Sequence, residues 1–166
     1  MENENTMQAN ENTLAPIAKN EVMALIKTAS SLELTKEESD KLIAPFDDDL
    51  IEIRPDGHIY LPQTYYRERL NEILGIGQWA LIVKGFNEEV SQTSTGDKKT
   101  KLFLNGLLVI RGCLVAEAVG EAEYFSTNAN QSIATAWESA KSDCITRCCK
   151  DLSIATQVYK PTYMRK

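Results

Sequence analysis

The sequence contains few of the residues that build metal sites, catalytic centres or membrane spans. Its 166 residues include one histidine, His58, and four cysteines. No CxxC pair occurs, and Cys144 and Cys148, one helical turn apart, lack histidine partners, so no metal site is predicted. No run of about 18 apolar residues exists, which excludes a transmembrane helix. GxSxG and Walker sequences are absent and the carboxylates do not pair at suggestive spacings, so neither an enzyme nor a cofactor is predicted.

The segment GIGQWA, residues 75–80, formally matches the dinucleotide-binding pattern G-x-G-x-x-G/A. That pattern requires a strand before it and a helix after it. Here the order is reversed, because a helical pattern ends at Gly75 and a strand pattern begins near Trp79. A helix end followed by a tight turn explains the glycines better, and a dinucleotide site is rejected.

Negative charge dominates the chain as a whole but is concentrated in its first third. The net charge is −6. Residues 1–57 hold 13 acidic and 5 basic side chains, a net of −8, whereas residues 58–166 hold 11 and 13, a net of +2. This asymmetry indicates an acidic arm on a mildly basic domain, although a solvated acidic face explains it equally well. The first 13 residues resemble neither a signal peptide nor a mitochondrial presequence, so an intracellular protein without a targeting segment is expected.

Composition divides the chain into three parts. The first part, residues 1–13, has no apolar periodicity and is predicted to be disordered. In the second, one helix begins at Pro16 or Asn20 and ends near Ser31, and another begins with a capping box of Thr35 and Glu38. The parts are a disordered acidic tail, an N-terminal helical extension and a core domain, at residues 1–13, 14–49 and 50–166.

Periodicity in the core domain predicts a helix, three strands and a long final helix. Two short extended pieces flank a Pro-Asp-Gly turn, and then Pro62 takes the first position of a helix that Gly75 ends. The first two strand candidates flank a polar turn with Gly96, which indicates an antiparallel hairpin. The predicted fold is an α+β sandwich in which the long helix lies across a three-stranded antiparallel meander. The strand candidates are Trp79–Val90, Lys101–Arg111 and Cys113–Ser126.

The final helix has an apolar stripe and a polar face. The stripe recurs at steps of three and four residues and holds Ile133, Trp137, Ala140, Cys144, Cys148 and Leu152. Cysteines in such a stripe are predicted to be small buried hydrophobes with reduced thiols. The opposite side carries Ser139, Asp143, Arg147 and Lys150. Asp143 and Arg147 are four residues apart, so a solvated salt bridge is the simpler reading of Arg147.

Basic residues near aromatic rings carry the main functional signal. Cations neutralise phosphates and aromatic rings stack on unpaired bases, so this combination of residues favours binding to a single strand of nucleic acid. Tyr60, Tyr65 and Tyr66 lie near two arginines, although two of these tyrosines are expected in the core. The lysines near residue 100 also fit an ordinary soluble turn. The candidate DNA-binding residues are Tyr60, Arg67, Arg69, Lys98, Lys99, Lys101, Lys141, Arg147, Lys150, Lys160, Arg165 and Lys166.

Two segments resemble a known family. LPQTYYRERLNEILGIGQW, at residues 61–79, and ESAKSDCITRCCKDLSIATQVYKPTYMRK, at residues 138–166, resemble fungal mitochondrial genome maintenance proteins, relatives of the Rad-fifty-two family of single-strand annealing proteins. The resemblance implies an α+β core in an oligomeric ring or helical filament, with single-stranded DNA in a basic groove and annealing without ATP. It assigns Arg147 and Lys150 to that groove, and it places Tyr60 near the position of an aromatic side chain that contacts the DNA strand.

Two features depart from the family pattern. Thr146 lies where relatives of the eukaryotic branch have another cation, which implies a less basic groove. The missing presequence favours a bacterial or bacteriophage recombination protein in the cytoplasm. Annealing of single-stranded DNA in recombination and repair is the preferred hypothesis, with a single-strand binding protein or an exonuclease as further partners. The alternative is a protein-interaction module that recruits such a partner through the acidic arm, and a thiol-dependent enzyme using Cys148 or Cys149 ranks lowest.

Overall fold

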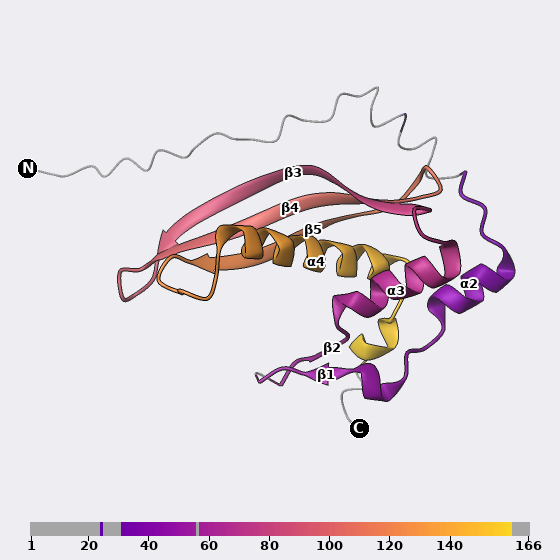
Figure 1. Ribbon diagram of the computed structural model, residues 1–166, viewed down its shortest axis with the longest axis horizontal. Coiled ribbons are helices and arrows are strands. Elements are labelled where there is room, and N and C mark those ends of the chain that lie inside the picture. The colour runs from indigo at the N-terminus through magenta and orange to yellow at the C-terminus, as the bar shows by residue number, and fades with distance from the viewer. Residues whose placement is uncertain (1–23, 25–30, 56, 161–166) are drawn as a thin grey trace, which may run out of the picture.

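The computed structural model describes Ala24, residues 31–55 and residues 57–160. Within them the chain has the predicted α+β fold, with a helix, a three-stranded antiparallel sheet and a long final helix. The tail at 1–13 and nearly all of the helix predicted after it lie outside the described residues. In chain order the elements are α2 (Lys36–Ile43), η1 (Asp48–Leu50), β1 (Glu52–Ile53), β2 (Ile59–Tyr60), α3 (Gln63–Leu74), β3 (Trp79–Gln92), β4 (Lys98–Ile110), β5 (Cys113–Phe125), α4 (Ile133–Asp151) and η2 (Thr156–Tyr159) (Figure 1).

The sheet has the strand order β3–β4–β5, and the turn between β3 and β4 is shorter than predicted. The Thr93 N–H donates to the Asp97 carbonyl at 2.9 Å, which closes the turn. Gly96 has a φ of 87°, a left-handed conformation that favours glycine. Strand β4 therefore begins at Lys98, and Lys98 and Lys99 belong to the strand rather than to a turn.

Helix α4 lies across β4 and β5 on one face of the sheet (Figure 1). Alternate residues of β4 are buried on that face. Glycines in both strands let the helix approach closely, because a Cβ on Gly106 would lie 2.6 Å from Cys144 Sγ and one on Gly120 would lie 2.1 Å from the Ala140 carbonyl oxygen. The three cysteines of α4 are buried free thiols, as predicted.

The buried side of α4 is wider than the predicted stripe. Ala136, Ile145 and Cys149 are fully buried as well. The predicted stripe assumed one packing partner, the sheet. Helix α3 also packs against α4, so a second side of α4 is buried. At the N-terminal end of α4 the predicted apolar stripe includes two residues that are not fully buried. Ile133 is 42% exposed and Trp137 is only half-buried.

Local signals set the ends of α2 and α3. The Thr35 hydroxyl accepts the Glu38 N–H at 3.1 Å and the Glu38 carboxylate accepts the Thr35 N–H at 2.8 Å, which is the predicted capping box. Pro62 is the N-cap of α3 rather than its first helical residue, a shift within the ordinary uncertainty of helix ends. Gly75 and Gly77 have φ values of 97° and 80°, so GIGQWA is a helix end and a turn, as predicted.

A small second sheet lies beside the C-terminal half of α4 (Figure 1). Strands β1 and β2 pair antiparallel, with Glu52 opposite Tyr60 and Ile53 opposite Ile59. Helix η2 packs against β2. Among the described residues, no helix has the length and apolar character needed to cross a bilayer.

Candidate nucleic-acid groove

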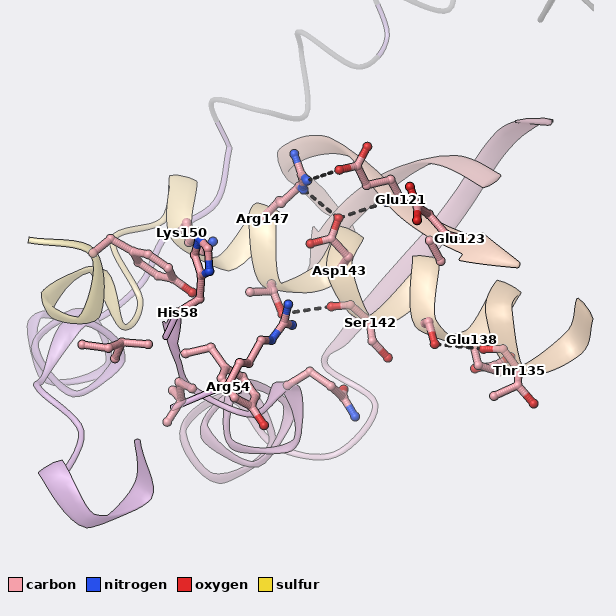
Figure 2. A pocket seen from close by; sticks show the side chains of 18 of the residues that line it. Arg54, His58, Glu121, Glu123, Thr135, Glu138, Ser142, Asp143, Arg147 and Lys150 are labelled. Atoms are coloured by element: carbon pink, nitrogen blue, oxygen red, sulfur yellow. Dashed lines mark hydrogen bonds and ion pairs between the residues drawn. The ribbon is translucent and has the colours of Figure 1, made fainter. Parts of the chain in front are cut away.

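A groove of about 1040 Å³ runs along the polar face of α4, between the β1–β2 hairpin and the outer edge of β5 (Figure 2). The hairpin and the start of α3 form one wall, and β5 forms part of the other. We call this space the α4 groove. Its lining side chains are Arg54, His58, Ile59, Tyr60, Leu61, Gln63, Glu121, Ala122, Glu123, Gln131, Thr135, Glu138, Ser139, Ser142, Asp143, Thr146, Arg147, Lys150 and Tyr159.

Charge in the α4 groove changes sign along the helix. The cations Arg54, Arg147 and Lys150 gather beside the C-terminal half of α4 (Figure 2). The lining also holds Glu121, Glu123, Glu138 and Asp143, so with His58 counted as neutral its three cations and four carboxylates give a net charge of −1. A single copy of the groove therefore has one cationic end rather than a uniformly basic floor.

Thr146 lies on the groove floor between the cations, and its hydroxyl donates to the Ser142 carbonyl at 2.9 Å. That bond is made within the helix, as serine and threonine hydroxyls often do. Thr146 therefore adds a polar surface to the groove but no charge. The expectation that the groove is less basic than in relatives stays a prediction.

Two of the groove cations lie against aromatic rings. Lys150 Nζ is 3.8 Å from the centroid of the Tyr159 ring, and Lys150 forms no salt bridge with any described residue. Arg54 Cζ is 4.9 Å from the centroid of the Tyr60 ring. The Tyr60 hydroxyl donates to Glu52, and this hydrogen bond raises the pKa of Tyr60. Exposed cation–π contacts are worth about 0.5–1 kcal/mol, so a phosphate can replace them at little cost.

Arg147 is the groove cation with the strongest partners. Its Nε lies 2.7 Å from Asp143 Oδ2, which is the salt bridge predicted from the spacing. Its Nη2 lies 3.6 Å from Glu121 Oε1. All three side chains are between 32% and 46% exposed, and exposed ion pairs of this kind contribute about 0–1 kcal/mol each.

Several of the predicted DNA-binding residues lie outside the groove and have structural partners. Lys141 pairs with Glu138 at 3.0 Å on the flank of α4. The Arg69 guanidinium lies 3.4 Å from the centroid of the Phe46 ring and donates to the Ala44 carbonyl, so it joins α3 to the segment after α2. Its burial lowers the pKa of Arg69.

The other predicted cations are also distributed away from the groove. Arg67 donates to the Gln63 side chain and lies 6.0 Å from the Trp79 ring centroid. Lys99 and Lys101 form salt bridges of 2.7 and 2.9 Å with two glutamates of β5. Lys98 and Lys160 are exposed on the sheet end and after η2, and Arg165 and Lys166 lie outside the described residues. Tyr66 is fully buried, as expected for a core tyrosine.

Arg54 was missed from the sequence. Its signal was present, because Arg54 and Tyr60 flank the Pro-Asp-Gly turn that the sequence predicts. No local sequence signal shows that this turn lies beside α4, which is about ninety residues further along the chain. Within the described part of the chain, no group of three or more His, Cys, Asp and Glu side chains is placed to hold a metal ion.

Comparison with known proteins identifies the relatives of the chain. The family described as "Mgm101p: Mitochondrial genome maintenance MGM101" matches residues 21–166. Mitochondrial genome maintenance protein mgm101 of Schizosaccharomyces pombe is 42% identical over 136 residues, which cover 82% of this chain and 46% of that protein. The mgm101 homolog of Dictyostelium discoideum is 43% identical over 132 residues, which cover 80% and 33%. The chain thus spans half or less of the length of these relatives.

These relatives overturn one prediction. A bacterial or bacteriophage protein of the cytoplasm was expected, and this is wrong, because the relatives are named mitochondrial genome maintenance proteins and come from fungi and Dictyostelium. The composition of the first 13 residues was a poor guide to location, since it concerns only a small part of the sequence. The match over residues 21–166 together with identities of 42% and 43% shows that the chain belongs to the Mgm101 family of mitochondrial genome maintenance proteins.

Proposed function

We propose that this chain binds single-stranded DNA in the α4 groove and anneals complementary strands without ATP, in the maintenance of a mitochondrial genome. The observation that carries the proposal is the cationic end of the groove, where Arg54, Arg147 and Lys150 face one space. The names of the relatives support a role in DNA maintenance. The relation to the Rad-fifty-two annealing proteins that the sequence resemblance implies is the support for the annealing step.

Annealing places simple demands on the protein. Two complementary strands repel each other through their phosphates, and cations that neutralise the backbone lower that barrier. Phosphates held by Lys150, Arg147 and Arg54 leave the base edges free to pair. The free energy then comes from base pairing and stacking, so we propose a binding protein with no catalytic group and no cofactor.

The proposal includes assembly into a ring or filament. One groove has three cations and a net charge of −1, so a single copy offers few net phosphate contacts. Grooves placed in series along one strand convert weak contacts into an intramolecular set with a high effective concentration. An oligomer therefore explains how a weakly charged groove retains a long strand.

The test is annealing of complementary oligonucleotides without ATP, measured beside binding to a labelled oligothymidine. We expect the wild type to anneal and Lys150→Ala to bind roughly threefold to tenfold more weakly, with a salt slope shallower by about 0.7, because one phosphate contact is lost. Lys150 is the cleaner position, since it has no salt-bridge partner among the described residues.

Lys41→Ala is the matched control. It removes the same charge from an exposed side chain of α2 that pairs with Glu37 and does not line the groove. A wild type that neither binds nor anneals contradicts the proposed function. Equal effects of Lys150→Ala and Lys41→Ala contradict the assignment of the groove.

A protein-interaction module is the second candidate, and the acidic charge favours it. Carboxylates outnumber cations in the groove, and residues 1–57 carry a net charge of −8. Such surfaces fit a basic protein segment. A salt titration separates the two functions, because phosphate contacts make the logarithm of DNA affinity fall steeply with the logarithm of salt concentration.

A further inference from the structure

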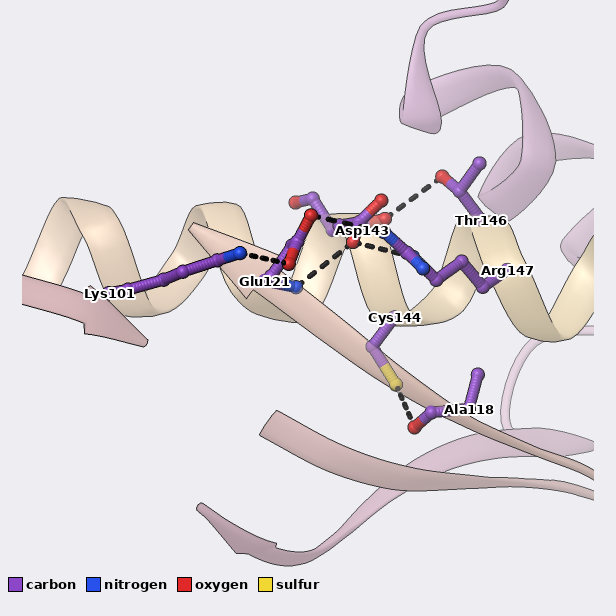
Figure 3. Close-up of polar contacts among 8 residues, drawn as sticks. Lys101, Ala118, Glu121, Asp143, Cys144, Thr146 and Arg147 are labelled. Atoms are coloured by element: carbon purple, nitrogen blue, oxygen red, sulfur yellow. Dashed lines mark hydrogen bonds and ion pairs between the residues drawn. The ribbon is translucent and has the colours of Figure 1, made fainter. Parts of the chain in front are cut away.

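The groove already contains an anion where a phosphate would bind. Arg147 is held at its Nε by Asp143 and approached at its Nη2 by Glu121, at 2.7 and 3.6 Å (Figure 3). Arginine binds phosphate and carboxylate through the same planar set of N–H donors. A phosphate that reaches Arg147 must therefore share or replace these carboxylates.

The two carboxylates are held in different ways. Asp143 Oδ2 also accepts the backbone N–H of Glu121 at 2.9 Å, so it joins α4 to β5 and is tied to the fold. Glu121 is 43% exposed and makes the longer contact with Arg147. Its other oxygen, Oε2, lies 2.9 Å from Lys101 Nζ. Glu121 can leave Arg147 and keep a cation, whereas Asp143 cannot move without breaking a backbone hydrogen bond.

Lys101 provides that alternative partner from the other side of the sheet. Burial alternates along β4, and Leu102 and Leu104 are buried on the face that α4 covers, whereas Lys101 lies on the opposite face. Glu121 is thus placed at the sheet edge between two cations, one in the groove and one behind it (Figure 3). When Oε1 of Glu121 leaves Arg147 and Oε2 stays with Lys101, the Nη2 end of Arg147 faces the groove with no carboxylate against it. Asp143 remains at Nε.

We propose that Glu121 is a displaceable counter-ion that occupies the phosphate-binding side of Arg147 and so lowers the affinity of the groove for a DNA backbone. The inference rests on the proposed function. Binding at this position is an exchange of one anion for another, and an isolated phosphate gains little from it. A strand held also by Lys150 and Arg54 supplies the additional contacts that drive the exchange.

The test is the affinity of Glu121→Gln for a fluorescein-labelled oligothymidine, measured by anisotropy across a salt series. We expect roughly threefold to tenfold tighter binding than wild type at physiological salt, because one unit charge is removed within a few ångströms of the phosphate. The salt slope should steepen by about 0.7, since Arg147 then makes a net phosphate contact. The amide is close to the carboxylate in size, and thermal unfolding checks that the fold is retained.

Glu117→Gln is the matched control. Glu117 lies on the same strand, is 46% exposed, and pairs with Lys84 at 3.1 Å, but it does not line the groove. The second comparison is Glu121→Gln in an Arg147→Ala background. If Glu121 acts through Arg147, the substitution there should change affinity no more than Glu117→Gln does.

The outcomes distinguish this inference from the proposed function. A wild type that binds the oligothymidine, with Glu121→Gln no tighter or no different from Glu117→Gln, overturns the counter-ion role alone. A full gain of affinity in the Arg147→Ala background also overturns it, because the effect would not pass through Arg147. If neither wild type nor Glu121→Gln binds, both the proposed function and the inference fail.

Discussion

At the scale of single residues, two glycines set how closely α4 lies on the sheet. A Cβ on Gly120 would lie 2.1 Å from the Ala140 carbonyl oxygen and 2.4 Å from the Cys144 amide nitrogen, both backbone atoms. A Cβ on Gly106 would lie 2.6 Å from Cys144 Sγ, a side-chain atom. The helix that lines the groove is therefore positioned by the absence of two side chains, and the two sites differ in what would have to move.

We expect Gly120→Ala to lower the free energy of unfolding by about 3 kcal/mol or more, because a helix backbone must shift to make room. Gly106→Ala should cost about 1–2 kcal/mol, because only side-chain atoms must yield, chiefly the Cys144 thiol and to a lesser extent a Leu81 methyl group. Cys144→Ala removes that thiol, so combining it with Gly106→Ala should cost less than the sum of the single effects. Urea unfolding measures these variants and also the combination of Gly120→Ala with Cys144→Ala, which should show no such rescue. Equal rescue at both glycines would contradict the assignment.

At the scale of elements, α2 is attached to the sheet through one carboxylate. Glu38 closes the capping box with Thr35 and also forms a salt bridge with Arg111, in the turn between β4 and β5. The hydrogen bond from Arg111 and the Thr35 N–H lower the pKa of Glu38 from 4.5 to about 2. The ionised carboxylate therefore favours the folded state.

The sign of the pH dependence follows from that lowered pKa. Stability from Glu38 is fully present above pH 4.5 and is lost as pH falls toward 2, because protons then bind the unfolded chain first. We expect Glu38→Gln to lower the unfolding temperature at neutral pH and the difference from wild type to shrink through this window. Glu37→Gln is the control, since Glu37 is exposed and, among the described residues, forms its salt bridge along the helix with Lys41. A difference that is constant with pH would rule out the role of the charge.

The range of the contacts explains which elements and site residues could be predicted. The capping box of α2 and the end of α3 at Gly75 depend on residues within one turn, and both were predicted. The wider buried side of α4 depends on α3, and the position of Arg54 depends on where the β1–β2 hairpin lies. Arg147 and its helix partner were found from their spacing, but the contact with Glu121 joins two elements and has no sequence period.

At the scale of the whole molecule, the described residues leave an apolar surface beside β3 without a covering helix. Helix α4 covers β4 and β5 rather than β3. Phe86 and Val90 on β3 are 58% and 59% exposed on the face toward α4, and Phe86 meets Trp137 edge-on at 5.0 Å between ring centroids. Ile133, one turn before Trp137, is 42% exposed. We call these four side chains the edge patch: Phe86 and Trp137 are in contact, and Val90 lies further along the same face of β3, with Glu88 between it and Phe86. Exposed apolar side chains gathered in this way mark interaction sites.

The assembly that the proposed function requires can use this edge patch. Strand β3 is one of the two edge strands of the described sheet and runs over 14 residues, so its outer backbone groups can pair with a second copy of the chain. We expect Val90→Lys and Phe86→Lys to shift the particle mass toward the monomer in light scattering, because a charge must otherwise be buried at the interface. Ile76→Lys is the control, since Ile76 is 89% exposed at the turn after α3 and lies outside the patch.

The same variants separate binding from annealing. Neither Val90 nor Phe86 lines the α4 groove, so a monomeric variant should retain most of its affinity for an oligonucleotide that fits one groove. Its annealing of long strands should fall much further, because the gain from grooves in series is lost. If these variants lose annealing but keep the particle mass of the wild type, the edge patch does not hold the assembly together. A wild type that remains monomeric with and without a single strand would contradict the assembly itself.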